Sequence, residues 1–356
     1  MSLEFQPTEI ITHIFLCCPD IPSVLALSAT CHRFRRIYNS SQKLPILERA
    51  ADAQFGPLED IIQLVTHNAS QPAHIVRTVP FSFALVRQIA HVGLVAEQWC
   101  DIYPFKKWKH NYEDRRLLTG HERLKFRRAL YRLWLYSHAF HNLRFPRTAR
   151  MQLPILRERA ELLHNWSTEE LAEMADVHSV LRDVVHSNLC PSNGTIARKF
   201  RKRHSEYGHE HQLLFNIHLN YPPPPLPPFQ PSSPHHNPTI PTHHFSYTRS
   251  NARYSKFWPT PFHEPGAEGW GDDIGHYYVV EDMMKLDPEQ ILWLKENAPL
   301  KQQVESYVKQ QGEWFENNGE TWGQTLQWVL LERGEDQGEL EERVQDGEWG
   351  VTTWED

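Results

Sequence analysis

The sequence predicts a mainly α-helical protein, and three observations support that fold class. Apolar residues recur at helical spacing in several segments, and short polar motifs typical of helix N-termini precede them. Little of the chain alternates between apolar and polar residues as a half-buried strand would. Hydrophobic residues make up 40% of the chain, which is enough to form a core. We expect short N-terminal helices followed by an irregular helical domain, interrupted by a long disordered loop rich in Pro and His.

The opening stretch "PTEIITHIFLCC" predicts the first of these helices. Pro7 suits the first helical position, and Glu9 places a carboxylate where the helix dipole favours it. No Lys or Arg precedes the apolar run, which is also far shorter than the roughly 20 residues that cross a bilayer, so neither a signal peptide nor a membrane anchor is expected. The apolar positions fall at i, i+1, i+4 and i+5 and form one broad face: Ile10, Ile11, Ile14 and Phe15.

A second helical segment follows directly. Pro19 ends the first helix, and Asp20 with Pro22 announces the next. Because a module of about 40 residues buries too little surface to be stable alone, we expect another surface to cover these helices. The apolar stripe of the second segment recurs at steps of three and four residues: Val24, Leu27, Cys31, Phe34 and Tyr38.

Together, "PTEIITHIF" and "IPSVLALSATCHRFRRIY" resemble the F-box, a helical motif of about this length found near the N-terminus of many eukaryotic proteins. The family pattern is Leu-Pro, Glu-Ile, an Ile-Phe pair, a Leu-rich helix and a Cys-x-x-[Trp or Phe] end. Gln6 stands where the family usually has Leu, and Phe34 replaces the commoner Trp. The resemblance covers residues 1–45, and the rest of the chain is only loosely similar to fungal F-box proteins. The matching residues are Pro7, Glu9, Ile10, Ile14, Phe15, Leu25, Leu27, Cys31 and Phe34.

The resemblance implies a function through partnership. F-box helices bind a Skp-family adaptor, which connects them to a cullin and a ubiquitin ligase (an SCF-type complex), while the remainder of the protein selects an unknown protein substrate. The chain itself is then not an enzyme. The alternative reading of the same residues is an ordinary core hairpin. The resemblance assigns adaptor contact to Pro7, Ile10, Ile11, Ile14, Phe15, Leu25, Leu27 and Phe34.

Residues 46–200 are expected to form a helical body. Two short helices should be broken at Gly56-Pro57, and an apolar-rich helix should run from Phe81 to about Lys109. Two capping boxes predict the starts of further helices. In a capping box, a hydroxyl and a carboxylate three residues later each accept a hydrogen bond from the other residue's backbone N–H. These pairs are Thr119 with Glu122 and Ser167 with Glu170.

The remainder divides by composition. Residues 201–261 contain "YPPPPLPPFQPSSPHHNPTIPTHHF" and are expected to form a disordered linker, although an SH3- or WW-type domain could bind such a stretch. Residues 262–333 are acidic and rich in aromatic residues, and Asp287-Pro288 marks a helix start. Trp258, Trp270, Tyr277 and Tyr278 need burial, so we expect this segment to dock on the helical body and the acidic tail 334–356 to fray.

The charge distribution raises an alternative function. The segment from Phe262 to Asp356 carries 6 Lys and Arg and 23 Asp and Glu, a net charge of −17, whereas the preceding residues carry 31 and 21, a net charge of +10. Within residues 101–150, 13 Lys and Arg are interleaved with aromatic residues, which suits a nucleic-acid-associated or non-ubiquitin scaffold protein. Because the whole chain is acidic, we favour solvated helix faces that are partly neutralised by the acidic segment, and nucleic acid is not expected as a partner.

Neither enzyme motifs nor metal sites are expected. The chain has no Walker A loop, no H-E-x-x-H and no G-x-S-x-G sequence, and "GWGDDIG" fits a turn better than a dinucleotide fingerprint. The five cysteines form no C-x-x-C pair, so no cofactor or defined zinc site is predicted, and the histidines at 235, 236, 243 and 244 could bind metal only weakly. These features indicate an intracellular protein of the cytoplasm or nucleus, without membrane contact.

Overall fold

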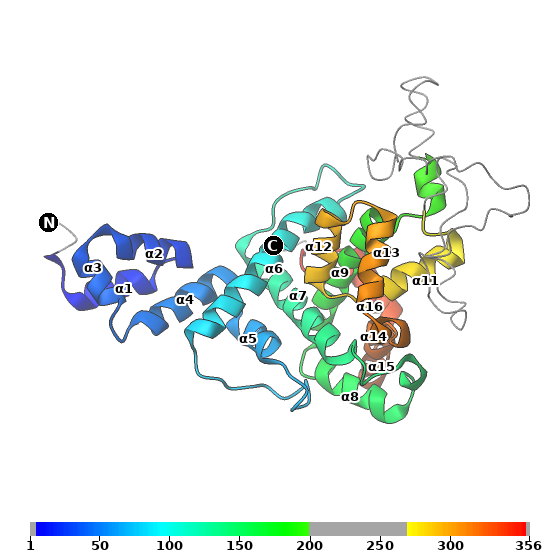
Figure 1. The fold of residues 1–356 in the computed structure, drawn as a ribbon, viewed down its shortest axis with the longest axis horizontal. Helices are drawn as coiled ribbons and strands as arrows, with labels where there is room; N and C mark the ends of the chain where they lie inside the picture. The colour runs from blue at the N-terminus through cyan, green and yellow to red at the C-terminus, as the bar shows by residue number, and fades with distance from the viewer. Residues whose placement is uncertain (1–4, 199–268, 354–356) are drawn as a thin grey trace, which may run out of the picture. The chain divides into compact units, whose positions relative to one another are not determined.

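The computed structural model describes residues 5–198 and 269–353, and these ranges are built from helices joined by loops, without a β-strand (Figure 1). The mainly α fold class is therefore confirmed. The Pro/His-rich linker expected at 201–261 lies outside the described residues, as do Trp258 and the histidines of that stretch.

The chain divides into two compact units. Unit one combines the residues up to Val180 with those from Thr321 onward, and unit two spans Leu181–Glu320. The acidic segment expected at 262–333 is thus shared between the units, because its last helix belongs to unit one and its earlier helices to unit two.

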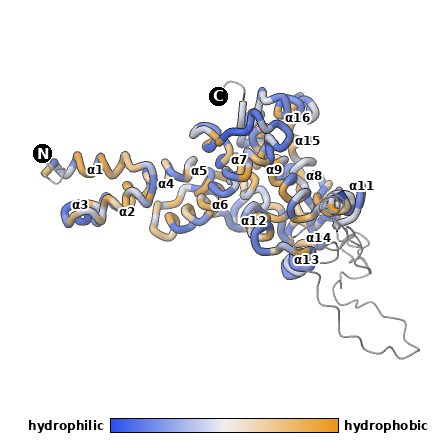
Figure 2. The backbone as a smooth tube through the Cα atoms, turned by 90° about the horizontal axis from the view of Figure 1, so that it is seen from above, coloured by the Kyte–Doolittle hydropathy of each residue, from blue (hydrophilic) through white to orange (hydrophobic). Residues whose placement is uncertain are grey.

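Four helices form the N-terminal part of unit one. The apolar character of the first, α1 (Thr8–Leu16), is visible along its length in Figure 2. Asp20 caps α2 by accepting the Ser23 N–H at 2.6 Å, as its position before Pro22 predicts. Pro7 is the N-cap of the first helix rather than its first helical residue. The helices are α1 (Thr8–Leu16), α2 (Ile21–Thr30), α3 (His32–Tyr38) and α4 (Lys43–Phe55).

The next three helices make the centre of unit one. The expected break at Gly56-Pro57 separates α4 from α5 (Leu58–Thr66), and the long apolar helix is α6 (Phe83–Lys107). α7 (Gly120–Phe140) packs on both α5 and α6. Tyr131 of α7 donates to the Phe55 carbonyl at 2.9 Å, so α7 satisfies a carbonyl at the end of α4.

The predicted helix starts are confirmed. Thr119 and Glu122 form a reciprocal capping box, in which Glu122 accepts the Thr119 N–H at 2.7 Å. Ser167 and Glu170 make the same pair of bonds at the start of α9 (Thr168–Val184). Asp287 caps the helix that begins at Pro288.

The C-terminal helices complete unit one. α15 (Trp322–Arg333) packs on α8 (Leu153–Leu163), and the buried Thr325 hydroxyl lies 3.0 Å from Arg159 Nε. The tail was expected to fray, but it forms α16 (Gln337–Gln345) and a turn that reaches Val351. The reason is burial: Leu340 and Val344, one turn apart, are both covered, and Val351 is fully buried.

Unit two is built around a π-helical turn, η3 (Val185–Leu189). α11 (Asp273–Met283) and α12 (Pro288–Asn297) pack against it, and α13 (Lys301–Gln310) and α14 (Glu313–Asn317) follow. Trp270 is fully buried and donates its backbone N–H to the Pro191 carbonyl at 3.0 Å. Tyr277 and Tyr278, which were expected to be buried, are instead 51% and 55% exposed.

Across residues 5–198 and 269–353, every helix is too short or too polar to cross a lipid bilayer.

Candidate partner-binding surface

The broad apolar face of α1 divides into two rows, and the inner row belongs to the protein's own core. Ile11 and Phe15, one turn apart, are fully buried. The Phe15 ring meets the Phe34 ring edge-on, with 6.2 Å between centroids, and lies 6.0 Å from the Tyr38 ring. The cluster around them includes residues of α4 and α6: Ile46, Leu47, Ala50 and Val86. The N-terminal helices are therefore covered in part by the helical body.

The outer row of α1 is not covered in this way. Ile10 is 48% exposed, and Ile14, one turn later, is half-buried. Phe5, directly before the helix, is 79% exposed, and Leu25 on α2 is 48% exposed. Moving large apolar side chains out of water is favourable, so a partner that covers these positions would be stabilised by their burial. We call Phe5, Ile10, Ile14 and Leu25 the outer apolar set.

Polar contacts fix the geometry of this set. Arg33 of α3 donates to the Gln6 carbonyl at 2.6 Å, which ties the segment before α1 to the third helix. Gln54 of α4 accepts the Ile21 N–H at 3.1 Å and so joins the start of α2 to the body. The Asp20 cap is also electrostatically favourable, because the hydrogen bond from Ser23 lowers the pKa of the Asp20 carboxyl.

The residues assigned to adaptor contact thus fall into two groups. The structure buries Ile11, Phe15 and Phe34 inside the chain, so their primary contacts are with its own core. Leu27 is partly buried against the same cluster. The remaining four are at least partly accessible: Pro7, Ile10, Ile14 and Leu25. Phe5, next to the unusual Gln6, was not among the assigned residues although its exposure exceeds theirs.

A hollow of about 510 Å³ lies at the C-terminal end of α1. Its apolar wall comes from Leu16 and from prolines at the ends of neighbouring helices, and its rim carries acidic residues. Arg49 pairs with Asp52 at 3.6 Å on that rim, and both side chains are largely exposed. The lining residues are Leu16, Pro45, Glu48, Arg49, Asp52, Pro57, Leu58 and Glu59. A partner on this side of the helices would meet an acidic edge.

The basic stretch 101–150 is largely engaged inside unit one. Arg132 lies 2.7 Å from Asp60, and Arg128 makes hydrogen bonds of 2.6 to 3.0 Å to Glu173. Burial raises the pKa of Glu173 despite the neighbouring Arg128. Further pairs are Arg116 with Glu122, Arg123 and Arg127 with Glu97, Arg144 with Glu158 and Lys107 with Asp176.

These pairs bear on the nucleic-acid alternative. In each of these pairs the carboxylate comes from the helical body itself. A guanidinium that is already bound to a carboxylate must break that bond to reach a phosphate. Of the interleaved aromatic residues, Tyr131 is fully buried, whereas Tyr112 is 70% exposed and its ring centroid lies 4.7 Å from the Arg115 guanidinium. Among the residues that the structure describes, the paired arginines argue against this stretch as a nucleic-acid surface.

No metal centre is visible in the part of the chain that the structure describes, where no group of three or more His, Cys, Asp or Glu side chains could hold an ion.

Comparison with protein-family models, with curated proteins and with solved structures finds no match for this chain.

Proposed function

We propose that the N-terminal helices bind a Skp-family adaptor through the outer apolar set, and that the chain thereby acts as a substrate receptor of an SCF-type ubiquitin ligase. The chain contributes binding and the associated ligase contributes the chemistry. Such a receptor acts inside the cell, in the cytoplasm or the nucleus. The proposal combines the F-box resemblance of residues 1–45 with the exposure of the apolar residues that carry it.

One observation supports the proposal most directly. Ile10 and Ile14 form a row on α1 beside the fully buried row of Ile11 and Phe15, so the helix has more apolar surface than its own core uses. An amphipathic helix that docks in a partner's groove uses anchors at this one-turn spacing. Phe5 and Leu25 add apolar area on neighbouring segments.

The test is capture of a purified Skp-family adaptor by the full chain, measured as a dissociation constant by isothermal titration. Ile10→Glu should weaken binding at least about thirtyfold, because central anchors contribute about 2 kcal/mol or more each. Leu143→Glu is the matched control, since Leu143 is 70% exposed on a loop of the same unit. It should bind as the wild type does.

Two results would contradict the proposal. The first is a wild-type chain that does not bind the adaptor while its circular dichroism spectrum shows a folded protein. The second is equal binding by Ile10→Glu and Leu143→Glu, which would mean that the outer row is not the contact. Transfer of ubiquitin is a separate step and needs a reconstituted ligase to be measured.

A further inference from the structure

Unit two contains a cleft of about 600 Å³ that the proposed adaptor contact does not use. Its walls come from the end of α9, from η3, from the helix that begins at residue 193 and from α11. Side chains with nitrogen donors and one aromatic ring dominate the lining: Arg182, His186, Arg198, His276 and Tyr277.

The two arginines of the cleft differ in their contacts. Arg198 makes hydrogen bonds within its own helix, to the Gly194 carbonyl at 3.4 Å and to the Thr195 hydroxyl at 3.2 Å, and neither partner is a carboxylate. Arg182 is shared between Glu281 at 2.6 Å and the Tyr277 ring at 5.3 Å.

The cleft also contains a carboxylate, and each of its oxygens accepts one hydrogen bond within the fold. Asp272 Oδ1 accepts the Gly194 N–H at 3.0 Å, and Oδ2 accepts a hydrogen from Asn193 Nδ2 at 3.1 Å. These bonds hold Asp272 at the start of the 193 helix and use two of its roughly four acceptor sites. Arg198, whose contacts include no carboxylate, is the cationic group of the cleft with the most capacity for an external anion.

An exposed apolar face adjoins the cleft on α11. Ile274 and Tyr278, one turn apart, are 73% and 55% exposed, and Tyr277 between them is 51% exposed and also lines the cleft. The opposite side of α11 supplies the core, where Val279 and Met283 are fully buried. The exposed face is thus additional to what the fold of unit two needs, and the Tyr277 and Tyr278 rings meet edge-on at 5.6 Å.

We propose that this cleft and the adjoining face of α11 bind an acidic peptide segment of another protein. A carboxylate or phosphate of the peptide pairs with Arg198, because a guanidinium presents several N–H donors that match such planar or tetrahedral oxygens. A neighbouring apolar side chain of the peptide packs on Ile274 and Tyr278. Tyrosine and arginine together are the residue types enriched at the centres of protein interfaces.

This inference goes beyond the adaptor contact and does not depend on it. The N-terminal helices belong to unit one, whereas every residue of the cleft belongs to unit two. If the chain is a substrate receptor, the acidic peptide would belong to the substrate. If it is not, the peptide-binding prediction stands unchanged and can fail or succeed separately.

The experiment uses the full chain and degenerate decapeptide pools, so that no single sequence has to be guessed. One pool alternates Asp or Glu with Leu, Phe, Tyr or Val, a second replaces the acids by Asn or Gln, and a third replaces them by phosphoserine. Fluorescence anisotropy at low salt should show binding of the first or third pool at least about tenfold tighter than the second. The stronger of the two anionic pools distinguishes carboxylate from phosphate as the preferred group.

Matched variants locate the site. Arg198→Glu should weaken binding of the anionic pool about tenfold or more, and Ile274→Ser should weaken it as well. Arg157→Glu is the control, because Arg157 is an exposed arginine of α8 in unit one. Thermal melts establish that each variant is folded.

Three outcomes would overturn the proposal. They are equal binding of the acidic and amide pools by the wild type, equal loss of binding in Arg198→Glu and Arg157→Glu, and tighter binding of a single-stranded oligonucleotide than of either anionic pool. The last would assign the cleft to nucleic acid instead.

Discussion

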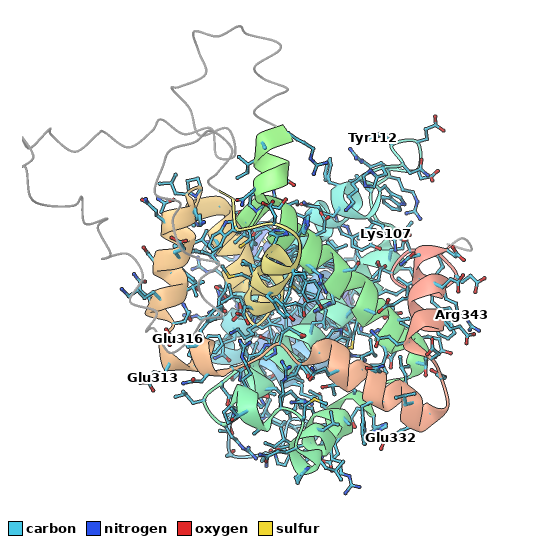
Figure 3. All side chains as sticks on the ribbon, turned by 90° about the vertical axis from the view of Figure 1, so that its right-hand side faces the viewer. Lys107, Tyr112, Glu313, Glu316, Glu332 and Arg343 are labelled. Atoms are coloured by element: carbon cyan, nitrogen blue, oxygen red, sulfur yellow. The ribbon has the colours of Figure 1, made fainter. Side chains whose placement is uncertain are left out.

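Lys107 and Asp176 form an ion pair inside unit one, with 2.8 Å between Nζ and Oδ1. Asp176 is fully buried and also accepts hydrogen bonds from the Tyr103 hydroxyl at 2.6 Å and from the Val351 N–H at 3.1 Å. Burial and the adjacent carboxylate raise the pKa of Tyr103 well above its usual value. Lys107, labelled in Figure 3, also reaches the Val344 carbonyl of α16 at 3.3 Å, so this carboxylate joins α6, α9 and the C-terminal turn.

Removing that carboxylate should destabilise unit one. We expect Asp176→Ala to lower the free energy of unfolding by about 3–5 kcal/mol, because it leaves a largely buried ammonium without its partner. Urea denaturation measures the change. Asp101→Ala is the control, since Asp101 is mostly exposed and pairs with Arg123 at 3.1 Å on the surface. That change should cost less than about 1 kcal/mol. Equal losses in the two variants would contradict a special role of Asp176.

The two rows of α1 should respond differently to truncation. Phe15→Ala should lower the free energy of unfolding by about 3–5 kcal/mol, because it opens a cavity in the cluster that joins α1 to α4. Ile10→Ala should change it by less than about 0.5–1 kcal/mol, because Ile10 is half in water already. Chemical denaturation followed by circular dichroism separates these outcomes. A larger loss in Ile10→Ala than in Phe15→Ala would show that the rows are assigned the wrong way round.

Unit two should lose stability as the pH rises. Burial raises the pKa of Glu305 from 4.5 to about 8, although Lys301 acts in the opposite direction. Glu305 therefore keeps its proton in the folded state at pH values where the unfolded chain has lost it. Between pH 4.5 and 8 the folded state binds more protons, so the free energy of unfolding falls with rising pH and levels off above 8.

Substitution provides the check on that titration. Glu305→Gln should flatten the fall in stability between pH 4.5 and 8, because the amide stays neutral throughout. Glu296→Gln, at an exposed position of α12, should leave the profile as in the wild type. Thermal melts of the full chain at a series of pH values measure both. A profile that is equally steep in Glu305→Gln would mean that another group titrates.

Local features of the fold could be predicted from the sequence. The capping pair of Thr119 and Glu122 depends only on residues within one helical turn, and so does the Asp287 cap. The break at Gly56-Pro57 is equally local. Such signals need no knowledge of tertiary contacts, because the bonds they form connect near neighbours in the chain.

Tertiary placement could not be predicted in the same way. Ile10 and Ile11 are chemically identical neighbours, and the positions of α3 and α4 decide which of them is covered. Asp176 has its partners 69, 73 and 175 residues away, so nothing in its own helix identifies it. In the tail, the one-turn spacing of Leu340 and Val344 is typical of a helix with one buried face, but the acidic composition predicted fraying.

The order of the two units along the chain has a consequence for biosynthesis. Leu181–Glu320 leaves the ribosome as one continuous piece and can begin to fold while translation proceeds. Unit one can complete its core only after the last helices have been synthesised. Two of its contacts depend on them: Asp176 accepts a hydrogen bond from the Val351 N–H, and the buried Thr325 hydroxyl accepts one from Arg159. Until then its early helices expose the surface that α15 and α16 later cover. That surface is where we expect chaperones to bind the nascent protein.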